Sequence, residues 1–305
     1  MFTRARHDHV HPLLLLCGGV AVVVLFILLS VEIDVSRFGI SFPRSHKASP
    51  SIFAGDAFDG VSVQAKAYVV YDLVDHVVVA SKHADEVLPL ASLTKVMTAL
   101  TARKDHSGET LITIRDASID GGYDLGLAKG QVWKLDELLK YTLVFSSNDG
   151  AQAIADALGG EKQFVQNMNT MSALLGLSLS FTDPAGLDEN GAWGGKGTAL
   201  DVAKLFAAAR KLHPELLEAT THPRVTVRAG KDLLTGVPNT NQTIGGFFGA
   251  EASKTGFTDD AGGNLGVIVD TALGHPVVII VLGSTREGRF EDVKALYDAL
   301  LKSIK

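Results

Sequence analysis

Residues 88–100 read Leu88-Pro-Leu-Ala-Ser-Leu-Thr-Lys-Val-Met-Thr-Ala-Leu100. The apolar side chains after Ser92 recur at helical spacing, so we predict a helix from Ser92 to Arg103 with the serine at its N-cap. Positions i and i+3 of a helix share one face. The hydroxyl of Ser92 and the amine of Lys95 are therefore expected within hydrogen-bond reach of each other.

A serine hydroxyl becomes a useful nucleophile only beside a base. A neutral lysine can act as that base when burial or a second cation lowers its pKa. Ser92-Leu-Thr-Lys95 therefore indicates acyl transfer. By itself the spacing is more typical of a capping serine followed by a solvated lysine.

Two further short motifs follow in order. Ser146-Ser-Asn148 lies in a predicted turn between helices, which can direct a hydroxyl and an amide into a cleft or simply cap the next helix. Lys254-Thr-Gly256 lies in a predicted strand, where the glycine allows close approach of another backbone or a ligand. A solvated lysine on an edge strand is the alternative interpretation of that motif.

The rest of the sequence predicts strands at both ends and helices between them. Alternating residues over 61–69 and the run 77–80 indicate a hairpin, and 264–269 and 277–282 are β-branched runs joined by a turn. Helical periodicity marks five further segments: Leu135–Phe145, Ala151–Leu158, Lys162–Leu175, Leu200–Leu212 and Phe290–Ile304. This order predicts a sheet built from the two chain ends with an all-helical lobe inserted between them.

The N-terminus predicts the location of the protein. We expect a cytoplasmic tail over 1–12, a transmembrane signal-anchor over 13–31 and a linker over 32–58. The apolar run is long enough to cross a bilayer, and Arg4 and Arg6 before it favour an inside N-terminus. A cleaved signal peptide is the alternative, but no small-x-small cleavage site follows the run. The catalytic domain is then extracytoplasmic, attached to the cytoplasmic membrane by one span.

Composition excludes several classes of protein. A net charge of −6 without clustered basic residues argues against a nucleic-acid partner. Cys17, in the apolar run, is the only cysteine, so the remainder can form neither disulfides nor a cysteine-based zinc site. His7, His9 and His11 fit a disordered tail better than a metal site. No cofactor and no metal is expected in the reaction.

The three motifs in this order match the pattern known for penicillin-recognising serine enzymes. The chain resembles the low-molecular-mass D-alanyl-D-alanine carboxypeptidases over residue 61 to the C-terminus, and the segments around the motifs add to the likeness. Those segments are Leu88–Leu100, Leu143–Asp149, Phe181–Asp188, Lys254–Gly262 and Arg289–Asp292. The resemblance implies an α/β (α+β) fold of the β-lactamase/DD-peptidase type over 59–305, with an antiparallel sheet flanked by helices and an inserted helical lobe.

The resemblance also implies the role of each residue. Ser92 would attack the D-Ala-D-Ala carbonyl of a peptidoglycan stem peptide, Lys95 would take its proton, and Ser146 and Asn148 would complete the catalytic group. The substrate-binding residues would be Lys254, Thr255, Gly256, Phe257 and Arg289. β-Lactam antibiotics would acylate the same serine.

Alternatives remain at this point. A DD-endopeptidase attacks the same carbonyl and differs in its leaving group. A serine β-lactamase shares the fold, but the Glu-x-x-Leu-Asn context of its deacylating glutamate is absent, and Glu189 is the nearest candidate. A silent peptidoglycan-binding module would not need the complete set of catalytic side chains.

Overall fold

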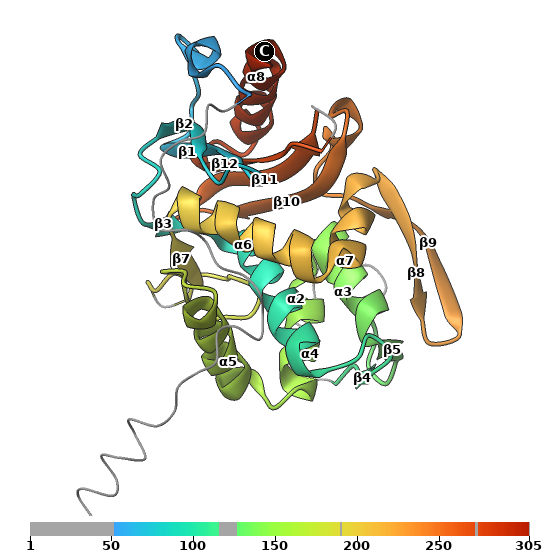
Figure 1. Cartoon of the computed structure of the whole chain (residues 1–305). Coiled ribbons are helices and arrows are strands. Elements are labelled where there is room, and N and C mark those ends of the chain that lie inside the picture. The colour runs from blue at the N-terminus through green and yellow to red at the C-terminus, as the bar shows by residue number, and fades with distance from the viewer. Residues whose placement is uncertain (1–51, 116–126, 190, 272–273, 305) are drawn as a thin grey trace, which may run out of the picture. The chain divides into compact units, whose positions relative to one another are not determined.

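The central sheet joins both ends of the described chain in the strand order β10-β11-β12-β1-β2 (Figure 1). Every neighbouring pair in it is antiparallel. The strands are β1 (Ala67–Asp72), β2 (Val78–Lys82), β10 (Ala250–Thr258), β11 (Gly262–Asp270) and β12 (Pro276–Ser284). β12 is β-branched and almost wholly buried, as expected of a central strand covered on both faces. The pairing of β1 with β12 joins the strands from the two chain ends into one sheet, as the sequence predicted.

A computed structural model describes residues 52–115, 127–189, 191–271 and 274–304. All of them belong to one unit that extends from Ser41 to Lys305. The predicted tail and membrane anchor, and most of the predicted linker, lie outside the described residues. Among the described residues, no helix has the length and apolar character needed to cross a membrane.

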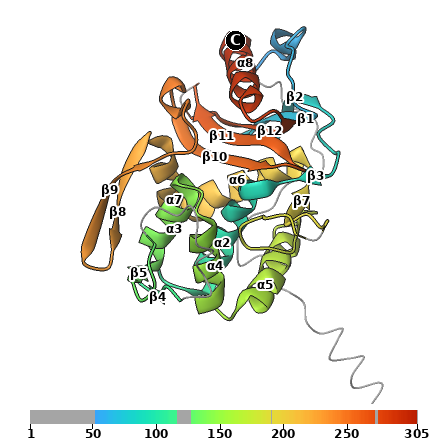
Figure 2. The ribbon, with the colours of Figure 1, turned by 180° about the vertical axis from the view of Figure 1, so that it is seen from behind.

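Helices cover both faces of the sheet (Figures 1 and 2). On one face, Leu265 and Val267 of β11 join a buried cluster with Val293 and Leu296 of α8 (Gly288–Ser303). On the other face lies α6 (Ala199–Leu212), so close that a Cβ on Gly266 would come within 2.6 Å of the Phe206 ring. Because side chains alternate along β11, one set of its residues packs on α8 and the other packs on α6.

The helical lobe surrounds α2 (Thr94–Asp105), in which every residue from Thr94 to Ala102 is buried. A helix enclosed on all sides positions its side chains rigidly. The other helical elements are η2 (Gly55–Phe58), η3 (Ala91–Leu93), α3 (Leu135–Val144), α4 (Asn148–Ala157), α5 (Glu161–Leu174), α7 (Pro214–Glu218), η5 (Ala219–Thr221) and η6 (Ile244–Gly246).

Three small sheets complete the described part of the fold. Their strands are β3 (Leu88–Pro89), β6 (Ser180–Phe181) and β7 (Gly195–Gly197), then β4 (Leu111–Thr113) with β5 (Val132–Lys134), and β8 (Arg224–Ala229) with β9 (Asp232–Pro238). Our sequence analysis missed the β8–β9 hairpin. Its signal was present, because Val225, Val227 and Ala229 alternate with polar residues before a turn at Gly230.

Two boundaries differ from those predicted. The end of the predicted linker is folded: Phe53 is 3% exposed and bridges to Ile304, and Ala54 N donates to Ser303 O at 2.7 Å. The apolar side chains of this short segment dock on the last helix, which a reading of Pro and Ser content alone does not reveal. The helix predicted to start at Ser92 starts at Thr94, because the serine lies in the tight turn η3.

Asn264 ties the sheet to the segment that precedes Ser92. Its buried side chain donates to Pro89 O at 2.9 Å and accepts from Gly283 N at 2.8 Å. We predict that Asn264→Ala lowers the free energy of unfolding by ~2–4 kcal/mol, because two hydrogen bonds are lost and their buried partners stay unsatisfied. Urea denaturation measures this. Asn167→Ala, on the exposed face of α5, is the control and should change stability by less than about 0.5 kcal/mol; equal effects would contradict the prediction.

Candidate active site

Ser92 is presented by a strained turn at the start of α2. Ala91 before it has a φ of 48°, a left-handed conformation that is uncommon for a residue with a side chain. Leu93 N closes the turn by donating to Leu90 O at 3.2 Å. Ala91 and Leu93 are fully buried, whereas Ser92 is half-buried. The buried neighbours therefore hold the turn while the hydroxyl reaches the surface of the site.

Lys95 lies one helical turn after Ser92, as predicted, and its amine is completely buried. Its Nζ is 2.7 Å from Ser92 Oγ, 2.8 Å from Asn148 Oδ1 and 2.9 Å from Ala185 O. A neutral amine needs only two N–H groups for the amide and carbonyl oxygens, which leaves its lone pair for the serine proton. The arrangement suits a general base next to a nucleophile.

The loop before β7 positions the carbonyl that Lys95 contacts. Asp183 Oδ1 accepts from Ala185 N and Leu187 N, both at 2.8 Å, and so fixes the loop. Gly186 has a φ of 80°, and a Cβ on it would come within 2.1 Å of Ala91 O. A glycine at this position allows the loop to pack directly on the serine turn.

Ser146 stands at the turn between α3 and α4 with a φ of 64°. Ser147 caps α4 by accepting from Gly150 N at 2.7 Å, while Asn148, the first residue of α4, extends its amide to Lys95. A Cβ on Gly150 would lie 2.4 Å from Thr142 Oγ1, so the glycine fits the space that Thr142 leaves. The second motif thus both caps a helix and supplies polar groups to the site.

Lys254 enters from β10 and is 2% exposed. Its Nζ donates to Ser146 Oγ at 2.7 Å and to Thr255 O at 2.8 Å. Burial, and to a lesser extent the positive charges of Lys95 and Arg289, hold the pKa of Lys254 well below its usual range. A positive charge on Lys95 thus disfavours a second one on Lys254.

β10 is the edge strand of the sheet, and it lies against the serine turn. A Cβ on Gly256 would lie 2.9 Å from Leu90 O and 3.2 Å from Ser92 N, which explains why this position needs glycine. Thr255 Oγ1 donates to Thr240 Oγ1 at 2.6 Å. The third motif therefore meets the first through its backbone as well as through Lys254.

Phe257 follows Gly256 in β10, and Arg289 reaches this part of β10 from α8. Arg289 Nη1 donates to Gly256 O at 2.7 Å, and burial, followed by the charge of Arg286, lowers the pKa of Arg289 to about 10. The ring of Phe257 lies beneath the guanidinium of Arg286, with 3.7 Å from Cζ to the ring centroid. Arg289 thus reaches the carbonyl behind Gly256.

The structure brings all three motifs together and adds partners that the sequence did not indicate. Ala185 contributes a backbone carbonyl, for which no side-chain signal exists. Thr240 comes from the loop after β9 and contacts Thr255. Asp188 accepts from Thr258 Oγ1 and from Gly194 N, and so connects the loop before β7 to β10. Ala185 and Asp188 both lie in the segment Phe181–Asp188, which was singled out in the sequence without a role for either residue.

Comparison with known proteins gives the family. The D-alanyl-D-alanine carboxypeptidase family matches residues 54–286. The chain belongs to this family. The resemblance read from the sequence is confirmed, and with it the class of a serine-type D-Ala-D-Ala carboxypeptidase.

Named relatives of the D-alanyl-D-alanine carboxypeptidase family agree. A D-alanyl-D-alanine endopeptidase of Haemophilus influenzae is 33% identical over 66% of this chain and 69% of its own length. The D-alanyl-D-alanine carboxypeptidase DacF of Bacillus subtilis is 30% identical over 70% of this chain and 57% of its own length. Ampicillin-bound Penicillin-Binding Protein D2 of Listeria monocytogenes superposes with a TM-score of 0.69 at 30% identity, covering 78% of this chain and 98% of that one. The predicted fold is therefore confirmed.

The depressed pKa of Lys254 makes stability depend on pH. Between that pKa and 10.5 the unfolded chain binds a proton that the folded chain resists, so stability should rise with pH. We predict that wild type gains stability relative to Lys254→Met as the pH rises toward 10.5, by at most ~1.4 kcal/mol per pH unit. Urea denaturation of both proteins across this range measures the difference, and parallel pH profiles would contradict it.

Proposed function

We propose that this protein removes the terminal D-alanine from peptidoglycan stem peptides through an acyl-enzyme on Ser92. The observation that carries the proposal is the unbroken chain of short contacts around Lys95, which joins the Ser92 hydroxyl to Asn148 and to the carbonyl of Ala185. A binding module does not need a buried amine against a half-exposed hydroxyl, since that geometry serves proton transfer.

Acylation begins as the lone pair of Lys95 takes the Ser92 proton and Oγ attacks the carbonyl between the two D-alanines. Lys95 must be neutral to act as the base, and the nearby Lys254 disfavours a positive charge on it. Ser146, which accepts from Lys254, can pass a proton to the departing amine. Asn148 holds the Lys95 amine in place and offers its amide N–H to the substrate.

The charge that develops on the substrate carbonyl requires hydrogen-bond donors. The backbone N–H groups of Ser92 and Phe257 form this oxyanion hole, which the close packing of Gly256 on the serine turn supports. Loss of one such donor typically costs about 2.7–4 kcal/mol. The terminal carboxylate of the substrate is held by Thr255 and Lys254, with Arg289 adding positive charge from behind Gly256.

Hydrolysis of the acyl-enzyme needs water. A class A β-lactamase accelerates this step with a dedicated glutamate. Glu189, the nearest candidate in the sequence, is exposed, and its backbone forms a bridge with Ala192. This favours slow release of a bound penicillin, so β-lactams act on the protein as acylating inhibitors. Solved relatives from Listeria monocytogenes contain ampicillin and cefotaxime.

The protein is placed at the outer face of the cytoplasmic membrane in this proposal. The support is the apolar run 13–31 with Arg4 and Arg6 before it. An extracytoplasmic catalytic domain would also meet peptidoglycan directly.

We predict that Ser92→Ala loses labelling by a fluorescent penicillin on the order of 10⁴-fold or more, because no other group in the site replaces the nucleophile. Labelling of membrane and soluble fractions from expressing cells, followed by gel fluorescence, measures this. Ser81→Ala, an exposed serine of β2, is the control and should label like wild type. Equal labelling of Ser92→Ala would exclude the proposed nucleophile, and a labelled wild-type band in the soluble fraction would exclude the anchor.

A second candidate activity is DD-endopeptidase, favoured by relatives that carry that name. Both activities attack the same carbonyl, so the product decides. We predict that purified muropeptide monomers lose one alanine while cross-linked dimers stay intact, as measured by mass spectrometry of the digests. Dimers split into monomers would instead assign the endopeptidase activity.

A further inference from the structure

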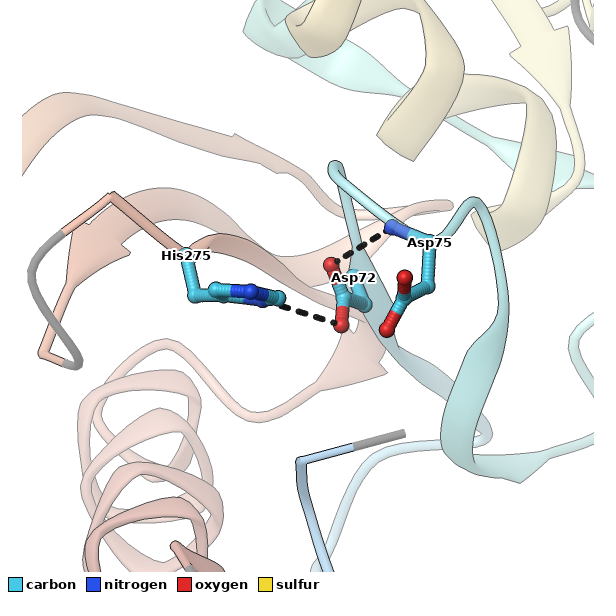
Figure 3. Close-up of side chains that lie close together, drawn as sticks. All are labelled: Asp72, Asp75 and His275. Carbon is cyan, nitrogen blue, oxygen red and sulfur yellow. Dashed lines mark hydrogen bonds and ion pairs between the residues drawn. The ribbon is translucent and has the colours of Figure 1, made fainter. Parts of the chain in front are cut away.

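Three ligand-type side chains meet at the end of the central sheet opposite to Asn264. Asp72 ends β1, Asp75 lies in the turn that follows, and His275 immediately precedes β12 (Figure 3). One ligand atom from each lies within 4.8 Å of the other two, and among the described residues no other set of three such side chains is so close. The cluster lies on two turns that neighbour each other in the sheet.

The carboxylate of Asp72 is the unusual member. The residue has no exposed surface, and its Oδ1 accepts from Val74 N at 2.8 Å and from Asp75 N at 3.2 Å. Its other oxygen, Oδ2, is buried and has no hydrogen-bond donor. A buried carboxylate oxygen without a donor is destabilising unless a cation lies beside it.

The distance from His275 Nδ1 to Asp72 Oδ2 is 3.6 Å, and that nitrogen is also buried without a hydrogen bond. This distance is longer than a normal hydrogen bond. Two ligands that each lie 2.0–2.2 Å from a tetrahedral zinc ion are about 3.4 Å apart. The spacing of this His–Asp pair therefore matches that of two ligands of one ion, whereas it is too long for a direct hydrogen bond.

The chemistry of the group favours zinc over the harder cations. Imidazole nitrogen with carboxylate oxygen suits zinc, whereas calcium prefers six to eight oxygens. The His275 side chain is 26% exposed and Asp75 is half-buried, so the site lies close to the surface although Asp72 Oδ2 and His275 Nδ1 are buried. The turns are preorganised as well, because Asp270 accepts from Gly274 N at 2.7 Å and from His275 N at 3.2 Å.

We propose that Asp72, Asp75 and His275 bind a zinc ion that fastens the β1–β2 turn to the β11–β12 turn. Bonds from Asp72 and Asp75 on one turn and from His275 on the other would hold the two turns together. The ion has no part in the reaction at Ser92, which lies against the opposite end of β10 and β11.

The test uses the full-length chain in detergent, stripped of metal with a chelator. His7, His9 and His11 could bind zinc themselves, so all three are changed to alanine in every protein compared. Titration with zinc against a chromophoric competitor should give one ion per chain. His275→Ala and Asp75→Asn should each weaken binding by more than about 100-fold, since even outer partners of a zinc ligand contribute 10–100-fold.

His222→Ala is the matched control, because His222 is a half-exposed histidine that also lies beside a carboxylate, that of Glu218. It should bind zinc like its parent. Free zinc at about 100 times the dissociation constant should raise the Tm of parent and control by roughly 5–10 °C and leave His275→Ala unchanged. Penicillin labelling should be equal in all variants, which shows that each is folded.

X-ray absorption of the zinc-loaded parent should show one imidazole among nitrogen and oxygen ligands at 2.0–2.1 Å. Three results would each overturn the proposal: no zinc bound by the parent, equal binding by His275→Ala and His222→Ala, or a first shell without imidazole. Failure here leaves the proposed peptidase function untouched, because the penicillin labelling reports on that separately.

Discussion

Two lysine amines buried side by side govern this structure. Lys95 is fully enclosed and Lys254 is 2% exposed, yet each is surrounded by oxygens from hydroxyl, amide or carbonyl groups. Burial of an unpaired ammonium is strongly unfavourable, and two of them repel each other. The conflict appears in the pKa of Lys254, which burial and the neighbouring charges hold well below its usual range. A site that disfavours two positive charges favours a neutral amine, and only a neutral amine can accept a proton as a base.

The rigid surroundings of the pair follow from where its members originate. Lys95 stands on the helix that the lobe encloses, and Lys254 stands on the edge strand of the sheet. Their relative position therefore depends on the contact between lobe and sheet, where Gly256 meets the serine turn without a side chain between them. Asn264 stabilises the same contact from inside the sheet by holding Pro89. The contacts that pack the helical lobe against the sheet therefore also set the positions of the catalytic side chains.

Much of this was accessible from the sequence because it is encoded locally. Helical period and β-branched runs predicted the helices and the sheet strands, and the spacing of Ser92 and Lys95 already implied a shared helix face. The need for glycine at Gly256 was also foreseen. What could not be foreseen depends on chain segments that meet only in the fold: the carbonyl of Ala185, the hydroxyl of Thr240, and the docking of Phe53 on the last helix. A carbonyl has no sequence signature, and a threonine is common in any loop.

The pairing of β1 with β12 has a consequence for how the chain comes to be folded. Val69 lies opposite Ile280, so these two strands pair in space although nearly the whole domain lies between them in the sequence. During synthesis the first strands have no partner to complete the sheet until the last strands leave the ribosome. Such long-range closure is slow, and unpaired strand edges are prone to aggregate. A chain interrupted before β12 would lack the strand that joins β1 to β11, and its unpaired strand edges would invite chaperones and proteases.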